Sequence, residues 1–185
     1  MSRLAQTILP KDKPQIITTR LIAAPRELVW KVLTMPEHLQ HFWGPDGFTN
    51  TYKQFDLRVG GQALYTMHGP DGTDYPNRMR FSEVIANTSM VAEHDAGKDG
   101  PDQYRFRYGI MLTDENGKTR VTISLLIADL ATRDEMTKFA AEGGRQNLDR
   151  LAAYVAPMAA AKNLFEIERT FAVSQERLFQ ACTRA

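Results

Sequence analysis

The first quarter of the chain predicts one strand followed by two short helices. Residues 16–23 are a strand candidate, rich in aliphatic and β-branched residues on both sides of Arg20. Pro25 suits the first position of a helix, where its missing N–H costs nothing, and Glu27 then lies near the positive end of the helix dipole. Pro36 begins the second helix, which ends at the turn residues Gly44-Pro45-Asp46-Gly47. The apolar stripe of the first helix recurs at spacings of three and four residues: Leu28, Val29, Val32 and Leu33.

Beyond these helices the pattern changes to short strands separated by turn residues. In residues 104–112 aromatic and aliphatic side chains alternate with Arg105 and Arg107, which is typical of an antiparallel strand with one buried face. Asn116-Gly117 predicts a tight hairpin after it, because glycine accepts the positive φ that such a turn requires. The strands predicted in this part of the chain are residues 48–54, 62–68, 79–85, 90–94, 104–112 and 121–127.

One long helix is predicted over residues 134–155, where apolar residues recur with helical spacing. Gly143-Gly144 in its middle costs roughly 1 kcal/mol per glycine relative to alanine. Two interpretations are open: a kink, or a need for bare backbone where the helix approaches a sheet or a ligand. Residues 156–164 are rich in alanine, contain Pro157, and are interpreted as a linker.

Because the strands are segregated from the helices, the fold class is α+β. We expect a curved antiparallel sheet of about six to seven strands wrapped around the long C-terminal helix, with two short helices after the first strand. A helix held against a curved sheet in this way encloses a cavity between the two layers. Residues 15–155 are therefore expected to form one complete domain.

The C-terminal segment resembles a second copy of the beginning of that domain. Residues 165–179 repeat the strand-then-helix pattern of residues 16–30, with Arg169 and Glu176 in the places of Arg20 and Glu27. We therefore interpret 165–185 as the truncated start of a second copy. It is a piece cut from a longer protein, a shortened gene product, or a tail that serves another purpose. A strand at 165–173 needs a free sheet edge, so we expect it to pair within the chain or to join a homodimer by strand exchange.

Composition and charge narrow the functional classes. A net charge of +1 without a long basic run disfavours nucleic-acid binding, which needs clustered cationic residues. The single Cys182 excludes a disulfide framework and fits a reducing cytoplasm, so we expect a cytoplasmic protein. No stretch approaches the roughly 20 apolar residues that span a bilayer. Residues 1–14 lack the apolar core of a signal peptide and are expected to form a loose polar tail.

Several motifs resemble those of a known superfamily. They are Thr19-Arg20, Ala24-Pro25, Val29-Trp30, Trp43-Gly44-Pro45, Asp56-Leu57-Arg58-Val59-Gly60-Gly61 and Met67-His68-Gly69-Pro70-Asp71-Gly72. Together they resemble the START-like, polyketide-cyclase-like (SRPBCC) superfamily, and within it the bacterial homologues of the activator of heat-shock-protein-90 ATPase. The resemblance implies the helix-grip fold and a hydrophobic cavity. It also implies a choice of roles, because the superfamily includes lipid and polyketide binders, cyclases and co-chaperone domains.

No residue pattern predicts a catalytic centre, a metal site or a cofactor. Cys182 is interpreted as an apolar filler, and His38 and His41 share a helix face but lack further ligands at metal-binding spacing. The cluster His68, Asp71, Asp74 and Arg78 is interpreted as turn chemistry. Glu83 shares its alternation with Met79 and Phe81, so an inward position with a raised pKa would allow general acid–base catalysis, unless a bulge turns it to solvent.

The predicted function is binding of a small hydrophobic or aromatic molecule between the sheet and the C-terminal helix. The alternatives are a cyclase- or hydrolase-type enzyme that uses the same cavity, and a co-chaperone-like domain that binds a chaperone partner. The residues expected to contact the ligand are Trp43, Phe48, Tyr65, Met67, Met79, Phe81, Glu83, Phe106, Tyr108, Ile123, Phe139 and Gly143.

Overall fold

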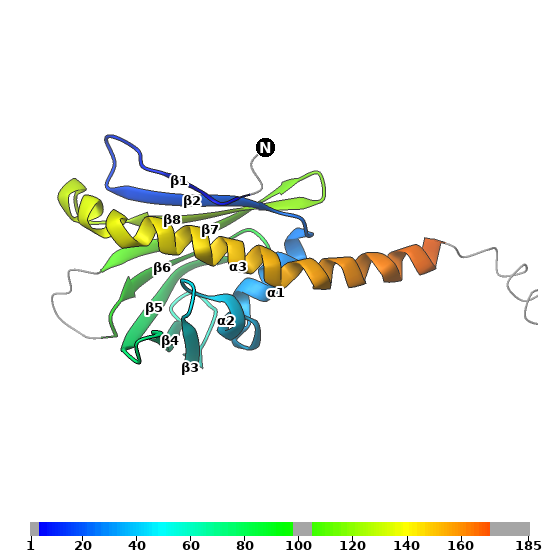
Figure 1. The fold of residues 1–185 in the computed structure, drawn as a ribbon, viewed down its shortest axis with the longest axis horizontal. Coiled ribbons are helices and arrows are strands. Elements are labelled where there is room, and N and C mark those ends of the chain that lie inside the picture. Colours follow the sequence, from blue (N-terminus) through cyan, green and yellow to red (C-terminus); the bar gives the residue numbers. More distant parts are fainter. Residues whose placement is uncertain (1–3, 98–104, 171–185) are drawn as a thin grey trace, which may run out of the picture.

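The computed structural model describes residues 4–97 and 105–170 of the chain. Within these residues one antiparallel sheet contains eight strands in the order β1-β2-β8-β7-β6-β5-β4-β3, and one long helix crosses it (Figure 1). The strands are β1 (Gln6–Ile8), β2 (Gln15–Ile22), β3 (Thr49–Phe55), β4 (Gln62–His68), β5 (Asp74–Ile85), β6 (Ser89–Asp95), β7 (Phe106–Glu115) and β8 (Lys118–Leu126). The helices are α1 (Arg26–Thr34), α2 (Pro36–Phe42) and α3 (Leu130–Thr170).

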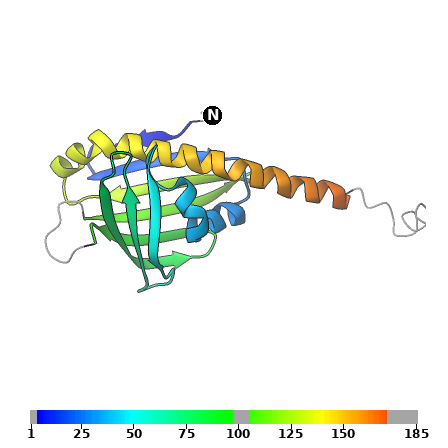
Figure 2. The same ribbon diagram turned by 60° about the horizontal axis from the view of Figure 1, so that its bottom comes forward.

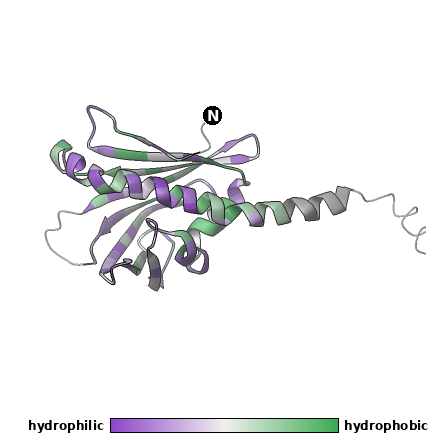
Figure 3. Ribbon diagram, viewed as in Figure 1, coloured by the Kyte–Doolittle hydropathy of each residue, from purple (hydrophilic) through white to green (hydrophobic). Residues whose placement is uncertain are grey.

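The α+β helix-grip prediction is confirmed. Figure 2 shows that the sheet curls strongly, with α1 and α2 at its open side and α3 along its inner face. Hydrophobic residues gather where α3 passes α1 and α2, whereas the outer strands are largely hydrophilic (Figure 3). The core contains many side chains that are almost completely buried, among them Ile22, Val29, Val32, Leu33, Phe42, Ile110, Val121, Leu148, Leu151 and Val155.

Local sequence explains several of these elements. Pro25 occupies the N-cap of α1 in an extended conformation, and Pro36 lies in the first turn of α2. The hairpin between β7 and β8 turns at Asn116 and Gly117, whose φ angles are 57° and 76°. Two successive residues with positive φ are what a two-residue type I′ turn requires, so this hairpin prediction is correct.

The N-terminal segment departs from its prediction as a loose polar tail. Residues 6–8 form β1, an edge strand that pairs with β2 so that Ile8 opposes Ile17. Ala5 is buried, and its N–H donates to the Asp149 carboxylate on α3 at 3.2 Å. A three-residue strand has too little alternation to be recognised in the sequence, and only its pairing with β2 stabilises it.

The C-terminal part also differs from the prediction. α3 continues through Pro157 to Thr170, so the expected linker at 156–164 is helical, and no strand forms over residues 165–170. Alanine is the best helix former, and the run around Pro157 therefore sustains the helix although the proline removes one backbone hydrogen bond. The remainder of the proposed second copy, residues 171–185 with Cys182, lies outside the described residues, and the homodimer stays a prediction.

Gly143 and Gly144 of α3 lie where the helix backbone closely approaches its neighbours, which agrees with the second of the two interpretations of this pair. A Cβ on Gly144 would lie 2.7 Å from Thr18 Oγ1 on β2, and a Cβ on Gly143 would lie 3.2 Å from Pro45 Cγ. Bare backbone at Gly144 therefore allows the helix to lie directly on the sheet. In the described part of the chain, no helix has the length and apolar character needed to cross a membrane.

Candidate functional site

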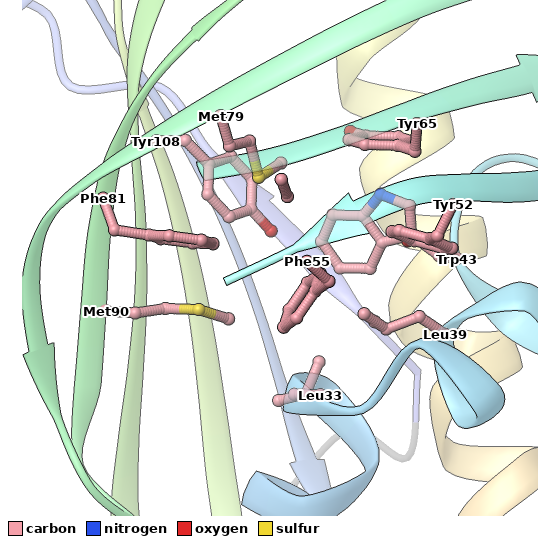
Figure 4. Close-up of a pocket in the computed structure, with 11 residues that line it drawn as sticks. Leu33, Leu39, Trp43, Tyr52, Phe55, Tyr65, Met79, Phe81, Met90 and Tyr108 are labelled. Atoms are coloured by element: carbon pink, nitrogen blue, oxygen red, sulfur yellow. The ribbon is translucent and has the colours of Figure 1, made fainter. Parts of the chain in front are cut away.

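A small, partly open cavity lies between α1, α2 and the inner face of strands β3–β7 (Figure 4). Its volume is about 20 Å³, which is room for about one water molecule. Among the described residues that line it, none carries a charge, and most are aromatic or sulfur-containing. The lining residues are Leu33, Leu39, Trp43, Tyr52, Phe55, Ala63, Tyr65, Met79, Phe81, Met90 and Tyr108.

The aromatic rings of the cavity pack in two groups. Tyr52 and Tyr65 are stacked, with ring centroids 5.1 Å apart. Trp43 meets Tyr108 edge-on, with centroids 5.8 Å apart. Both geometries are favoured by the quadrupoles of the rings, so the walls are held in defined orientations. Met79 and Met90 provide the adaptable part of the lining, because an unbranched thioether changes rotamer readily (Figure 4).

Three tyrosines supply the polar groups of this apolar site. Burial raises the pKa of Tyr65 to about 12, although a side-chain hydrogen bond with Trp43 acts in the opposite direction. Burial also raises the pKa of Tyr52 and Tyr108 well above the ordinary value, and neighbouring phenols add to the effect. All three phenols are therefore protonated at neutral pH and can donate hydrogen bonds.

The hydroxyl of Tyr108 stands apart from the other two. Tyr108 is 6% exposed, and Figure 4 shows its oxygen pointing into the group of lining side chains. Within the described part of the chain, Tyr108 Oη has no hydrogen-bond partner. Buried hydroxyls are normally paired, and Tyr108 Oη is the polar group of the described wall that is free to bond a molecule inside the cavity.

α3 contributes to the site indirectly, by fixing the loop that carries Trp43. The guanidinium of Arg150 donates to the backbone carbonyls of Gly44, Pro45, His41 and Phe48. Asn147 on the same helix accepts the Gly44 N–H at 3.3 Å. On the other side of the loop, Asn50 Nδ2 donates to the Trp43 carbonyl at 2.5 Å. The loop between α2 and β3 is thus held from two sides.

The structure brings together five of the twelve residues expected to contact a ligand. These five line the cavity: Trp43, Tyr65, Met79, Phe81 and Tyr108. Ile123 is buried in the same core without reaching the cavity. Met67 packs against the core and approaches Gly44, and Phe48 packs against Tyr75 with centroids 5.9 Å apart. Phe106 stacks on His94 and lines a separate open groove.

Glu83 does not point inward. It is exposed and accepts a hydrogen bond from Ser89 Oγ at 2.9 Å. A β-bulge shifts the pairing of β5 with β6 between Phe81 and Glu83, and the extra residue turns Glu83 to the outer face. The acid–base role required an inward carboxylate, so the position of Glu83 does not support it. Val84, the next residue, packs against the core.

In the described structure, α3 contributes no residue to the wall of this cavity, and contact of its residues with a ligand stays a prediction. Phe139 is 56% exposed, and Gly143 contacts Pro45 of the loop. The walls come from α1, α2 and the sheet because α3 lies directly against β2. Sequence analysis missed six lining residues, among them Leu33, which stood in the predicted apolar stripe. The missed residues are Leu33, Leu39, Tyr52, Phe55, Ala63 and Met90.

The other chemical candidates have structural partners. His38 Nδ1 lies 3.1 Å from Tyr154 Oη, and His41 stacks on the same tyrosine. His68 pairs with Asp74 at 2.6 Å across the β4–β5 hairpin. In the residues that the structure describes, no three His, Cys, Asp or Glu side chains gather as a metal site would require.

Comparison with known proteins places this geometry in a family. The model of the family described as Activator of Hsp90 ATPase homolog 1-like protein matches residues 23–156. A solved protein from Mycobacterium smegmatis is similar with a TM-score of 0.72 and 24% identity, over 80% of this chain and 94% of its own. No curated protein matches the chain.

Two further solved structures have the same fold. A protein from Nitrosomonas europaea has a TM-score of 0.72 and 23% identity, over 82% of this chain and 99% of its own. A protein from Arthrobacter aurescens has a TM-score of 0.73 and 21% identity, over 82% of this chain and 91% of its own. At such identities the likeness concerns the fold alone.

Proposed function

Because the chain belongs to the family of Activator of Hsp90 ATPase homolog 1-like proteins, we propose that it binds a small hydrophobic or aromatic molecule in the cavity between α1, α2 and β3–β7. The observation that carries the proposal is the cavity wall itself. It combines aromatic rings, two methionines and an unpaired hydroxyl, with no charged side chain. Apolar walls with a few placed polar groups are typical of small-molecule sites.

Binding requires the cavity to expand. A site for a single benzene ring has a volume of roughly 150 Å³, whereas this cavity measures about 20 Å³. Met79 and Met90 line it from β5 and β6, and their side chains can rotate without moving the backbone. The proposal therefore includes a rearrangement of methionine side chains as the ligand enters.

A cavity-filling substitution tests the proposal. Ala63→Val adds two carbons at the lining, and Ala159→Val adds the same two carbons in the core on α3, which contributes no residue to the described lining. We expect native mass spectrometry, after incubation with cell extract and a panel of aromatic metabolites, to show a retained small molecule on the native protein and on Ala159→Val. Ala63→Val is expected to retain at least fivefold less of this small molecule, because its added methyl groups occupy the remaining volume of the cavity.

Overpacking costs about 1–3 kcal/mol at either position, so both variants are compared at a temperature where both are folded. A native protein that stays empty with every compound would contradict the proposal. Equal retention by all three proteins would place the ligand elsewhere.

The family description favours a second candidate, a co-chaperone-like role toward an Hsp90-type ATPase. Its direct measurement is the rate of ATP hydrolysis by such a chaperone with and without the protein. An enzymatic role has less support, because Glu83 lies on the outer face and the tyrosines are the only titratable groups among the described lining residues. A cytoplasmic location remains a prediction.

A further inference from the structure

The buried hydroxyl of Tyr108 restricts which ligand the cavity accepts. A buried hydroxyl without a partner costs about 1–3 kcal/mol, and such groups are therefore rare in folded proteins. Tyr108 comes from β7, in the middle of the sheet, and its ring is fixed edge-on against Trp43. The hydroxyl cannot swing out to solvent without breaking this contact, so its partner has to enter the cavity.

Tyr108 differs from the other two phenols in its hydrogen bonding. The Tyr65 oxygen accepts a side-chain hydrogen bond from Trp43, whose indole N–H is a donor only. Tyr52 stacks on Tyr65 and is less deeply buried than the other two. Among the three phenols, Tyr108 is the one whose oxygen is both buried and unpaired among the described residues.

The charge of the ligand follows from the lining. None of the lining residues is Lys, Arg, His, Asp or Glu, so a charged group in the cavity would have no counter-ion. An uncompensated buried charge costs several kcal/mol or more. A carboxylate, a phosphate or an ammonium is therefore excluded from the buried end of the ligand.

The shape of the ligand follows from the walls. Trp43, Phe55, Phe81 and the stacked tyrosines present ring faces and edges, and Met79 and Met90 add sulfur. Aromatic edges and thioethers both make favourable contacts with a flat ring. An aliphatic chain would gain the free energy of apolar burial, but it would not make these directional contacts.

We infer that the ligand is an uncharged aromatic molecule whose buried end carries an oxygen that accepts a hydrogen bond from the Tyr108 hydroxyl. The inference rests on the proposed function and specifies its ligand class as aromatic ketones, aldehydes, quinones and related carbonyl compounds. Tyr108 is the residue that distinguishes this class from plain hydrocarbons of the same shape.

Two probes of nearly equal shape test the inference. Acetophenone carries a carbonyl oxygen where α-methylstyrene carries a CH₂ group. We expect isothermal titration calorimetry to show tighter binding of acetophenone to the native protein. Tyr108→Phe removes only the hydroxyl. It is expected to raise the Kd of acetophenone about tenfold and to change the Kd of α-methylstyrene by less than about twofold.

Tyr154→Phe is the matched control, since it removes a hydroxyl that pairs with His38 Nδ1 at 3.1 Å and lies outside the cavity lining. It is expected to preserve the ratio of the two affinities. If Tyr108→Phe leaves that ratio unchanged while both probes bind, the ligand class is wrong and the binding function stands. If neither probe binds the native protein up to its solubility limit, the proposed function fails and the inference falls with it.

Discussion

Replacing Arg150 with alanine is expected to lower the free energy of unfolding by about 3 kcal/mol and to weaken acetophenone binding. One guanidinium donates to four backbone carbonyls, which are those of His41, Gly44, Pro45 and Phe48. Bonds from charged donors are each worth about 1.5–3 kcal/mol, and their loss leaves partly buried carbonyls without partners. The loop also carries Trp43, so the cavity wall loosens with it.

The comparison variant is Arg145→Ala on the same helix. Arg145 pairs with Glu142 one turn away, and the two side chains are 39% and 55% exposed. Such pairs contribute about 0.3–0.5 kcal/mol, so this variant should unfold at nearly the native urea concentration. Arg150→Lys should recover only part of the loss, because an ammonium lacks the planar fork that reaches several carbonyls. If Arg150→Ala and Arg145→Ala had the same stability and the same affinity for acetophenone, Arg150 would not be the residue that holds the loop in place.

The second large effect is expected for Asp95→Asn, which should destabilise the protein by about 3 kcal/mol at neutral pH. The Asp95 side chain is 1% exposed, and its carboxylate pairs with Arg78 at 3.1 Å and Arg80 at 3.0 Å. It also accepts the Gly97 N–H at 2.9 Å. The amide carries no charge and cannot accept all of these bonds, so the mostly buried Arg78 guanidinium loses its ion pair with residue 95.

The pH dependence of stability follows from the same carboxylate. Burial alone would raise the pKa of Asp95, but the hydrogen bonds from Arg78 and Gly97 and the charges of Arg78 and Arg80 outweigh it and lower the pKa below 3.8. A folded pKa below the unfolded value means that the stabilisation is complete above about pH 4 and is lost as the pH falls through the folded pKa. Acid denaturation should therefore depend less on pH in Asp95→Asn than in the native protein.

Asp74→Asn is the control for Asp95, because Asp74 is 65% exposed and pairs with His68 at the same end of the sheet. An exposed pair contributes about 0–1 kcal/mol, so its loss should barely move the urea midpoint. Two results would argue against a structural role for the buried carboxylate. One is an equal change in the urea midpoint for both substitutions, and the other is an unchanged loss of stability at low pH in Asp95→Asn.

The sequence predicted those parts of the fold whose pattern is local. The alternation in β7 and β8 marked one buried face, and Asn116-Gly117 marked the turn between them. The stripe of α1 and the family motifs were equally local, and the family match over residues 23–156 confirms the resemblance. Each of these features depends on neighbouring residues, and the sequence shows neighbours directly.

The candidate site was harder to predict because it depends on long-range geometry. One extra residue in β5 reversed the expected face of Glu83, and a similar shift in β3 brought Phe55 into the cavity. Alternation in the sequence identified the residues on the inner face of the sheet. Which of these residues contact one another depends on how strongly the sheet curls, and the sequence does not show this. The alanine-rich stretch around Pro157 was compatible with a linker and with a helix, and composition alone did not separate them.

The most direct test of the central claim follows the methionine methyl groups by NMR. Met79 and Met90 line the cavity, whereas Met111 is 52% exposed on the outer face and serves as the internal control. With ¹³C-methyl methionine, titration with acetophenone is expected to shift the Met79 and Met90 signals through the ring current and to leave Met111 in place. Shifts at Met111 with unchanged Met79 and Met90 would show that the probe binds the surface and that the cavity stays closed.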